Sequence, residues 1–582
     1  MKLIQNIGLV LFVIALLIFT AMLGVGHQTL TPDTLGVDEN FNEAVLAKAN
    51  ERGLINKQLP LVSFISEYKS VLKEIPEIQK WQRNNFIGAA VKSSAGGPVQ
   101  NNPWLWFLLT FGLGSLGGLL FILPKFLKSP GIKNNGIYHN PLTRGIKFGT
   151  KQIFWWVGAI GIIVWGFIKD GNLIFPIITV LIAALIFYLS VLRPSANTKG
   201  EDRSASPIDT GWLGIIAGVY FIGFYILLYW ASPYINNWVS MVDPLSQKLN
   251  GGNASQWFLY GFMYCVLVLV MGIRMMAKYI HNKYQIVRTF SVILFQIGFA
   301  FLIPQFISKL NVRTGSSIPA IDLKNIWPLN YDLFAAYNMD TWLSSSWGMA
   351  ALIWGIALIF LAVPLMTYFF GKRWYCSWVC GCGGLAETMG DPYRQLSDKS
   401  LKAWRFERYI IHGVMVAAAV MTILVLVSYT SQGNEYMNFG IFSAGGLRSW
   451  YGFLIGAGFA GVVGTGFYPI MGNRVWCRFG CPLAGYLGLV QKFKSKFRIT
   501  TNGGQCISCG NCSTYCEMGI DVRSYAQRGQ DIVRSSCVGC GVCSAVCPRG
   551  VLRLENSAGD VATRTDALRT VHITADEIKI LS

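Results

Sequence analysis

The chain has 582 residues, of which 53% are hydrophobic and only 13% charged, a balance that is too apolar for a soluble protein and typical of a membrane protein. Its 49 Lys and Arg against 29 Asp and Glu give a formal net charge of +20, but the basic residues lie mostly in loops between apolar stretches, and no nucleic-acid motif is present. These features exclude nucleic acid as a partner and indicate membrane lipid instead.

The first apolar stretch runs from Leu3 to Leu23, behind Lys2. As a helix rising ~1.5 Å per residue, it is long enough to cross a hydrocarbon core of ~30 Å. A signal peptide would look similar, but no small-x-small cleavage site follows, so residues 1–23 are predicted to be an uncleaved transmembrane anchor. Residues 24–102 are polar with helical periodicity and are predicted to form a small periplasmic helical segment.

Nine further apolar stretches predict an α-helical polytopic membrane protein with about ten transmembrane helices. Residues 103–345 would hold helices 2–7 and carry no motif that indicates a function, whereas residues 346–498 would hold helices 8–10. The predicted spans after the anchor are 103–123, 151–168, 172–192, 211–231, 256–276, 289–307, 346–370, 408–429 and 450–471.

The loops between these spans differ in basic charge. One set holds 20 Lys and Arg, in loops 124–151, 193–210, 273–288 and 371–408. The alternate set holds 6, in loops 169–171, 232–255, 308–345 and 430–449. Because basic loops stay on the cytoplasmic side, and an even number of spans returns the chain to its starting side, both termini are predicted to be cytoplasmic in a multi-pass protein of the bacterial inner membrane.

A motif with two cysteines occurs twice, 101 residues apart and directly after predicted spans. The copies read Gly371-Lys372-Arg373-Trp374-Tyr375-Cys376-x3-Cys380-Gly381 and Gly472-Asn473-Arg474-Val475-Trp476-Cys477-x3-Cys481-Pro482. Two such pairs supply four thiolates, so Cys376, Cys380, Cys477 and Cys481 are predicted to form a third iron–sulfur or redox-thiol centre, with Cys382 as a substitute ligand or resolving thiol. The competing interpretation is two separate thiol pairs that exchange disulfides.

The densest cysteine pattern lies near the C-terminus. It reads Cys506-x2-Cys509-x2-Cys512-x3-Cys516 and, after twenty residues, Cys537-x2-Cys540-x2-Cys543-x3-Cys547-Pro548. In two-cluster ferredoxins, three closely spaced thiolates bind one [4Fe-4S] cluster and the fourth ligand crosses over from the other run. The pattern therefore predicts one cluster on Cys506, Cys509, Cys512 and Cys547, and a second on Cys537, Cys540, Cys543 and Cys516.

Two alternatives for this pattern, a pair of zinc knuckles and a disulfide knot, are less favourable. Zinc sites rarely place four cysteines within eleven residues twice. Thirteen of the fourteen cysteines follow residue 370, and none lies in a predicted external segment, which indicates a reducing compartment. Residues 499–555 are thus predicted to be an α+β two-cluster ferredoxin-like domain, followed by a tail at 556–582.

Roughly from residue 346 to 555, these motifs resemble the NosR/NapH family of membrane polyferredoxins, most specifically from Cys516 through Asp521 to Cys547-Pro548-Arg549-Gly550. The resemblance implies electron transfer between the quinone pool or a cytoplasmic donor and a periplasmic reductase system, with nitrous-oxide and nitrate respiration as the family's settings. The chain departs from the family at Gly381-Cys382, where the family has Pro. No covalent FMN is expected, because residues 24–102 lack the threonine attachment motif of the nitrous-oxide branch.

Other functions remain open at this stage. The chain could be an electron carrier or a quinol dehydrogenase-like oxidoreductase component. It could instead be an assembly factor that reduces metal centres or thiols of a partner oxidase or reductase, or, less favoured because few ionisable residues interrupt the spans, a redox-regulated transporter. A haem on His281 and His412 is disfavoured because no second matched pair exists. The basic run from Lys492 to Arg498 fits anionic lipid or an acidic donor protein equally well.

Overall fold

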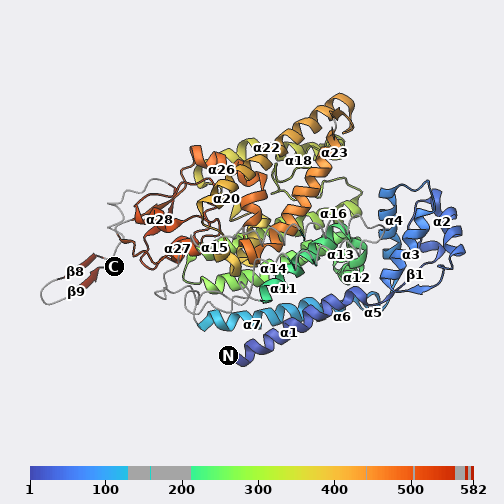
Figure 1. The fold of residues 1–582 in the computed structure, drawn as a ribbon, viewed down its shortest axis with the longest axis horizontal. Helices are drawn as coiled ribbons and strands as arrows, with labels where there is room; N and C mark the ends of the chain where they lie inside the picture. The colour runs from blue at the N-terminus through green and yellow to red at the C-terminus, as the bar shows by residue number, and fades with distance from the viewer. Residues whose placement is uncertain are drawn as a thin grey trace.

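The computed structural model describes residues 1–128, 212–440, 442–502, 505–556, 570–573 and 578–581, together with residues 158, 182 and 186. This part of the chain is mostly helical, and its short strands form small sheets. Figure 1 shows an elongated molecule with the N-terminus and the cysteine-rich C-terminal module toward one end and a small domain at the other. That arrangement fits a chain that crosses a membrane along its long axis.

Among the described residues, six helices are long and apolar enough to cross a membrane. A seventh candidate is the pair Gly214–Trp230 and Ser232–Met241, which is bent by 110° next to Pro233, a residue that cannot continue a helical hydrogen-bond ladder. The six are Lys2–Gly24, Pro103–Pro124, Gln256–Lys278, Lys283–Thr314, Ser346–Phe370 and Leu401–Gln432.

The prediction of about ten spans is therefore confirmed only in part. The predicted spans 151–168 and 172–192 lie outside the described residues, apart from residues 158, 182 and 186. The predicted span 450–471 is helical as far as Gly466, where a turn at Phe467 interrupts it, and it is not among the six.

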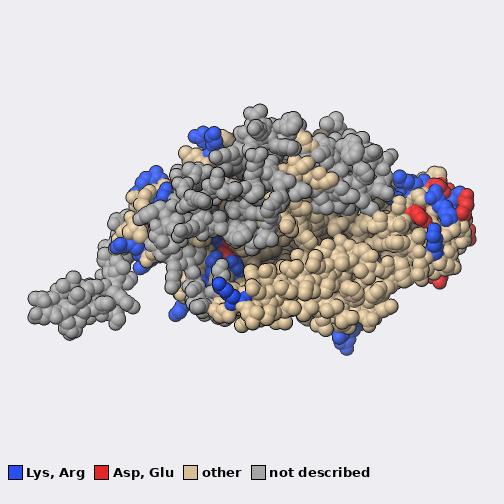
Figure 2. Space-filling model, turned by 60° about the horizontal axis from the view of Figure 1, so that its bottom comes forward, with Lys and Arg blue, Asp and Glu red and all other residues tan. Residues whose placement is uncertain are grey.

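The outward surface of the spans is apolar, as lipid contact requires. Ile353, Phe360, Leu361 and Ile423 each expose more than half of their surface. Figure 2 shows a wide surface with few charged residues, while charged side chains gather mostly toward the two ends of the molecule. Because apolar side chains at this density would not face water in a soluble protein, the exposed belt marks the membrane-facing surface.

The N-terminal part forms a helical hairpin of two spans with a small domain between them. Its elements are α1 (Lys2–Ala21), η1 (Met22–Gly24), β1 (His27–Thr29), η2 (Pro32–Thr34), α2 (Glu39–Glu51), β2 (Gln58–Leu59), α3 (Leu61–Lys73), α4 (Lys80–Ser93), β3 (Ala95–Gly96), α5 (Pro98–Asn101), α6 (Pro103–Phe107), η3 (Leu108–Gly112) and α7 (Leu113–Lys128).

Helices α1 and α7 approach closely because two glycines face each other. A Cβ atom at Gly8 would lie 2.7 Å from the Gly117 carbonyl oxygen, and one at Gly117 would lie 2.7 Å from the Gly8 carbonyl oxygen. Small residues at such crossings allow backbones to pack tightly within a membrane. The small domain has its own core around Phe64, Tyr68 and Val71, and includes a sheet of order β2-β1-β3 that the helical prediction for residues 24–102 did not include.

The middle of the chain is helical. Its elements are α11 (Trp212–Trp230), η4 (Ser232–Ile235), α12 (Asn236–Met241), α13 (Asp243–Asn250), α14 (Gln256–Lys278), α15 (Lys283–Leu294), η5 (Phe295–Leu302), α16 (Ile303–Thr314) and α17 (Ala336–Leu343).

The segment between α16 and α17 turns back into the protein. Trp354 donates a hydrogen bond from Nε1 to the Leu323 carbonyl oxygen (2.8 Å), and Tyr375 donates one to the Lys324 carbonyl oxygen (2.9 Å). These two bonds hold the segment against the helix that carries Trp354 and against Tyr375 of the first C-x3-C motif. The loop 308–345, which the charge distribution predicts to lie on the external side, thus contributes buried residues such as Ile326 and Leu333 to the main core.

The third part carries the two C-x3-C motifs. Its elements are α18 (Ser346–Ala357), η6 (Leu358–Ala362), α19 (Val363–Phe370), α20 (Arg373–Cys376), α21 (Gly381–Thr388), η7 (Asp391–Leu396), α22 (Leu401–Gln432), β4 (Asn438–Phe439), β5 (Phe442–Ser443), α23 (Ala444–Tyr451), η8 (Gly452–Val463), α24 (Gly464–Gly466), α25 (Tyr468–Met471), η9 (Trp476–Gly480) and α26 (Pro482–Lys494).

The cysteine-rich module is closed by an antiparallel strand pair, β6 (Arg498–Thr501) with β7 (Leu552–Glu555), so its first and last segments lie side by side. Between them lie α27 (Asn511–Thr514), α28 (Val522–Gln527) and α29 (Val542–Ala545). The predicted tail contains the hairpin β8 (Thr570–Ile573) and β9 (Ile578–Leu581). One continuous core includes residues of this module and both C-x3-C motifs, which joins the module to the membrane part.

Candidate iron–sulfur centres

The first predicted ligand set lies around one recess at the surface of the module. Cys506, Cys509, Cys512 and Cys547 all line it, so the fourth residue comes from the other cysteine run. Burial, with smaller contributions from the nearby Cys547, Cys509 and Cys506 thiols, raises the pKa of Cys512 to about 12. Free thiols here would hold their protons, and iron would have to displace them on binding.

The second predicted set lies deeper. Burial raises the pKa of Cys543, and the neighbouring Cys540, Cys516 and Cys537 thiols add to the shift. Burial likewise raises the pKa of Cys537 to about 11, with Cys516 again a neighbour. The structure thus brings Cys516 to the three cysteines of the other run. Cys512 also lies near Cys543, which makes the two sets adjacent.

The two C-x3-C motifs meet in the core just inside the module. Burial raises the pKa of Cys481, and its neighbouring thiols are Cys477, Cys380 and Cys376, so one residue of the second motif is close to both residues of the first. All four are buried. The structure therefore brings together the four thiols proposed for a third centre.

The two motif copies share a local structure that follows from their sequence. Each begins at a glycine in the left-handed region, Gly371 with φ 64° and Gly472 with φ 88°, where a side chain would be strained. In each copy the second cysteine precedes a helix and its sulfur accepts a backbone hydrogen bond, Cys380 from Gly383 and Cys481 from Ala484 (3.4 Å). Helix N-termini favour negative charge, and thus a thiolate ligand.

The fifth cysteine of this region behaves differently from the other four. A side-chain hydrogen bond with Cys382 lowers the pKa of Cys380 to about 6, against the opposing effect of burial. The same bond, together with burial, raises the pKa of Cys382. Cys380 is therefore the sulfur of this group that is most easily deprotonated, and Cys382 is placed beside it as an alternative ligand or a partner in a disulfide.

A buried carboxylate lies between the module and the membrane motifs. Glu517, next to Cys516, binds Arg394 Nη1 (2.8 Å) and Arg474 Nη2 (3.0 Å), and all three side chains are fully buried. Burial alone would raise the pKa of Glu517, but the two arginines lower it to about 2. Glu517 is therefore ionised at neutral pH and holds the two arginines together.

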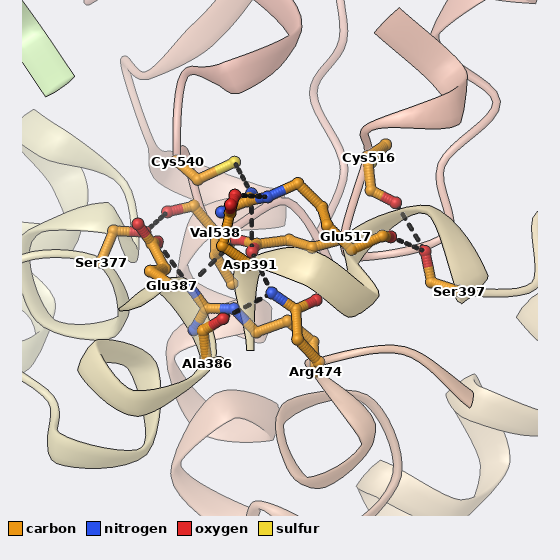
Figure 3. A network of polar contacts seen from close by, with 12 residues as sticks. Ser377, Ala386, Glu387, Asp391, Ser397, Arg474, Cys516, Glu517, Val538 and Cys540 are labelled. Atoms are coloured by element: carbon orange, nitrogen blue, oxygen red, sulfur yellow. Dashed lines mark hydrogen bonds and ion pairs between the residues drawn. The ribbon is translucent and has the colours of Figure 1, made fainter. Parts of the chain in front are cut away.

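Each of these arginines also reaches a cysteine sulfur. Arg394 Nη1 lies 3.8 Å from Cys540 Sγ in the second predicted set, and Arg474 Nη1 lies 3.7 Å from Cys477 Sγ in the third. Figure 3 shows Cys540 and Cys516 on one side of the network and Arg474 on the other, with Glu517 between them. A continuous chain of polar contacts thus connects the module to the membrane motifs.

Further charges complete this network. Asp391 binds Arg274 (2.7 Å), Lys278 (2.8 Å) and Arg394 (3.3 Å), which hold the pKa of its carboxyl well below the ordinary range although burial opposes this. Glu387 binds Arg288 and Arg474. Buried charges survive only when paired in this way.

Polar side chains of the membrane part also hold the backbone of the second cysteine set. They donate hydrogen bonds to the main-chain carbonyl oxygens of predicted ligands and of the residues between them. These bonds fix the module on the membrane part. The bonds run from Tyr284 to Gly539 (2.8 Å), Gln285 to Cys540 (2.9 Å), Ser377 to Val538 (2.8 Å), Ser397 to Cys516 (2.7 Å) and Gln491 to Cys537 (2.9 Å).

The two histidines considered for haem lie against different elements. His281 packs near the ring of Tyr279, at 6.4 Å between ring centroids, and His412 lines a pocket beside α26. In the described ranges, no three His, Cys, Asp or Glu side chains are arranged to hold a single metal ion. The three cysteine groups supply sulfur ligands in the number that a [4Fe-4S] cluster uses.

Sequence reasoning missed the residues that connect the centres. Arg474 lies within the second motif, and Glu517 lies next to Cys516, so the position of each in the sequence marked it as close to a predicted ligand. The sequence did not show that the two residues contact each other. Arg394 and Gln285 carry no local signal, because their roles arise from segments far apart in the chain. Lys324 was also missed; its charge lies close enough to Cys380 to lower the pKa of that thiol.

Comparisons with known proteins agree with these cysteine groups. A family model described as a 4Fe-4S binding domain matches residues 352–400 and 451–500, which contain one C-x3-C motif each. A second, described as a 4Fe-4S dicluster domain, matches residues 505–552. The chain therefore carries a 4Fe-4S dicluster domain and additional 4Fe-4S binding motifs.

One relative is YccM of Escherichia coli (strain K12), whose name assigns it to electron transport. It is 27% identical over 194 residues, which are 33% of this chain and 52% of the relative. The match thus spans about half the length of that protein. No solved structure matches the chain. Taken with the candidate spans, these findings describe a protein that carries 4Fe-4S binding domains and several candidate membrane helices.

Proposed function

We propose that this chain is an electron carrier of the bacterial inner membrane, in which three [4Fe-4S] centres form one path from the cytoplasmic surface into the membrane. The first cluster, on Cys506, Cys509, Cys512 and Cys547, accepts single electrons from a soluble donor. The second, on Cys537, Cys540, Cys543 and Cys516, passes them to a third on the C-x3-C cysteines. An iron–sulfur cluster supplies one-electron chemistry, so each transfer changes one centre by one electron.

The observation that carries this proposal is the chain of contacts Cys540–Arg394–Glu517–Arg474–Cys477. It places the second and third cysteine groups on opposite sides of one buried carboxylate, with contacts of 2.8 to 3.8 Å along the way. Both arginines put positive charge beside a sulfur ligand, and positive charge favours the more negative, reduced form of a cluster. The residues thus favour electron residence at the second and third centres.

The exposure of the cysteines indicates where electrons would enter the protein. Three cysteines of the first set are partly exposed and line a surface recess, whereas only two of the second set, Cys516 and Cys540, are partly exposed. Arg523 and Arg549 line the recess of the first set, which suits an acidic donor protein. Electrons would enter at the more exposed set and leave through the more buried one.

The exit lies in the membrane. The segment after α16 turns back toward the third centre, and Lys324 is among the charges near Cys380. We propose that quinone in the bilayer, or a membrane or periplasmic redox partner, takes the electrons there. In the NosR/NapH-like setting that the motifs resemble, that partner would be a nitrous-oxide or nitrate reductase system.

An experiment with lipid vesicles distinguishes quinone from a partner protein as the electron acceptor. The purified full-length protein is placed in liposomes with or without menaquinone, a chemical reductant that does not cross the bilayer is added outside, and ferricyanide is trapped only inside the vesicles that lack menaquinone. We expect all centres to be reduced in both samples. Quinone should be reduced to quinol, with two electrons and two protons each, and a Cys540→Ser variant should stop this step. Reduced centres with quinone that stays oxidised would contradict the quinone exit, and ferricyanide reduction without quinone would show a complete path within this chain.

A second candidate function is supported by the hydrogen-bonded Cys380 and Cys382 pair. Two such thiols can reduce a partner's disulfide by thiol exchange, in which their own sulfurs form a disulfide and the partner gains two electrons and two protons. This is the chemistry of an assembly factor that reduces partner thiols. Mass spectrometry after anaerobic labelling of thiols decides it: a reversible Cys380–Cys382 disulfide in oxidised membranes supports this function, whereas iron-dependent protection of Cys380 in every redox state supports a cluster ligand.

A further inference from the structure

A pocket lies between the module, α22 and α26. Its cavity volume is about 160 Å³, which leaves room for a small anion but not for a drug-sized ligand. Its lining includes Cys477, one of the proposed ligands of the third centre. Anything bound in this pocket therefore lies beside the redox path.

Four cations from separate segments converge on this pocket: Lys372, Arg408, Lys492 and Arg534. Lys372 is buried, with 1% of its surface exposed, whereas Arg408 and Lys492 are exposed at the mouth. The one carboxylate in the lining, Glu407, is already bound to Arg478 (3.0 Å). We call this site the basic pocket.

These cations differ from four fully buried arginines of the described chain. Arg288, Arg394, Arg474 and Arg478 each have a carboxylate partner. Within the described ranges, no carboxylate lies within ion-pair distance of the four cations of the basic pocket. Lys372 lies near the Cys376 thiol of the third group, so Arg408, Lys492 and Arg534 are the cations that remain for a ligand in the pocket.

Two further polar groups in the lining also have no partner in the described structure. Ser536 is 8% exposed, and its Oγ makes no hydrogen bond. The Nδ1 atom of His412 makes none either. A hydroxyl at the wall can donate to an oxyanion, as can guanidinium and ammonium groups. The aromatic ring of Trp404 adds an apolar wall, over which Arg534 is stacked at 4.7 Å.

We propose that the basic pocket binds a phosphate-bearing anion at the cytoplasmic membrane surface. Several converging cations, a free hydroxyl and no free carboxylate match the charge and oxygen-rich shape of a phosphate group. The same chemistry is offered by the headgroup of an anionic lipid and by a soluble phosphate compound. Its position beside Cys477 means that occupancy adds negative charge next to the third centre.

The test uses the full-length protein and inorganic pyrophosphate as the probe. Binding is measured by isothermal titration calorimetry in phosphatidylcholine nanodiscs and in nanodiscs with added phosphatidylglycerol. The pocket variant Lys492→Gln/Arg534→Gln is compared with Lys494→Gln/Arg528→Gln. This control removes an exposed lysine of the same helix and an arginine stacked on Tyr525, both outside the pocket. Lys372 is left unchanged because it also lies near Cys376.

We expect saturable binding in phosphatidylcholine, weakened at least tenfold in the pocket variant and unchanged in the control. Competition by phosphatidylglycerol would identify a lipid headgroup as the occupant, and binding indifferent to that lipid would identify a soluble anion. No saturable binding in phosphatidylcholine, or equal weakening in both variants, would overturn the proposal. Iron content equal to that of the native protein shows that a variant is folded. If the pocket variant loses iron, Ser536→Ala, which removes one hydroxyl, takes its place under the same criteria.

Discussion

Arg474 is the residue at which the two halves of the proposed electron path meet. It contacts Glu517 beside one proposed ligand and Cys477, another proposed ligand. It also donates to the Cys376 carbonyl oxygen (3.2 Å). One positive charge thus acts on both C-x3-C motifs, and its removal leaves Glu387 and Glu517 with less neutralisation.

Replacing this charge should make the third centre harder to reduce. We expect Arg474→Gln to lower the midpoint potential of that centre by on the order of 100 mV, which is ~2.3 kcal/mol per electron and within the range of a charge interaction at ~4 Å in a partly polar interior. The measurement is a redox titration followed by electron paramagnetic resonance. Arg448→Gln, which alters a partly buried ion-pair group with Asp332 and Glu435 away from the cysteines, is the control and should leave the potential unchanged.

The crossed ligand assignment can be separated from an uncrossed one in a background that lacks the first cluster. In a Cys506→Ser/Cys509→Ser protein, one ferredoxin cluster should remain on Cys537, Cys540, Cys543 and Cys516. Adding Cys547→Ser should then leave its paramagnetic signal intact, while adding Cys516→Ser should remove it. The reverse result would show that each run binds its own cluster.

At the level of elements, the cysteine-rich segments were predictable because a cluster restricts the spacing of its ligands, and that spacing is visible in the sequence. The grouping of the two C-x3-C motifs could also be predicted, since both follow apolar stretches and repeat the same residues. The ion pairs among Arg394, Glu517 and Arg474 could not, because they join segments that only tertiary packing brings together. The sheet of residues 27–29, 58–59 and 95–96 was missed because strands this short leave no periodic pattern.

The crossing of α1 and α7 gives a prediction about stability. Gly117→Leu would place a side chain where the backbone of α1 now lies, and we expect a loss of at least 1–3 kcal/mol in the free energy of unfolding, the range for overpacked sites. Thermal unfolding in detergent is the measurement. Gly413→Leu is a matched control, because nothing lies within 4 Å of its Cβ position; equal loss in both variants would argue against a tight crossing.

At the level of the whole molecule, the N-terminus and the cysteine-rich module lie toward one end and the small domain at the other (Figure 1). We propose that the first end is cytoplasmic, in line with the distribution of basic loops. Reporter fusions after Ser317, an exposed residue of the segment after α16, and after Ser582 should give opposite signals. The same signal from both would contradict this topology.

The central claim is that three groups of cysteines in this chain bind three [4Fe-4S] clusters. The most direct test is to count iron and acid-labile sulfide in the anaerobically purified full-length protein, and in a variant with all eight ferredoxin cysteines changed to Ser. We predict about twelve irons and twelve sulfides per native chain, and about four of each in the variant, with a remaining cluster signal in electron paramagnetic resonance. An iron-free variant that still inserts in the membrane would leave the C-x3-C motifs as thiols only, and zinc in place of iron in the native protein would contradict the account as a whole.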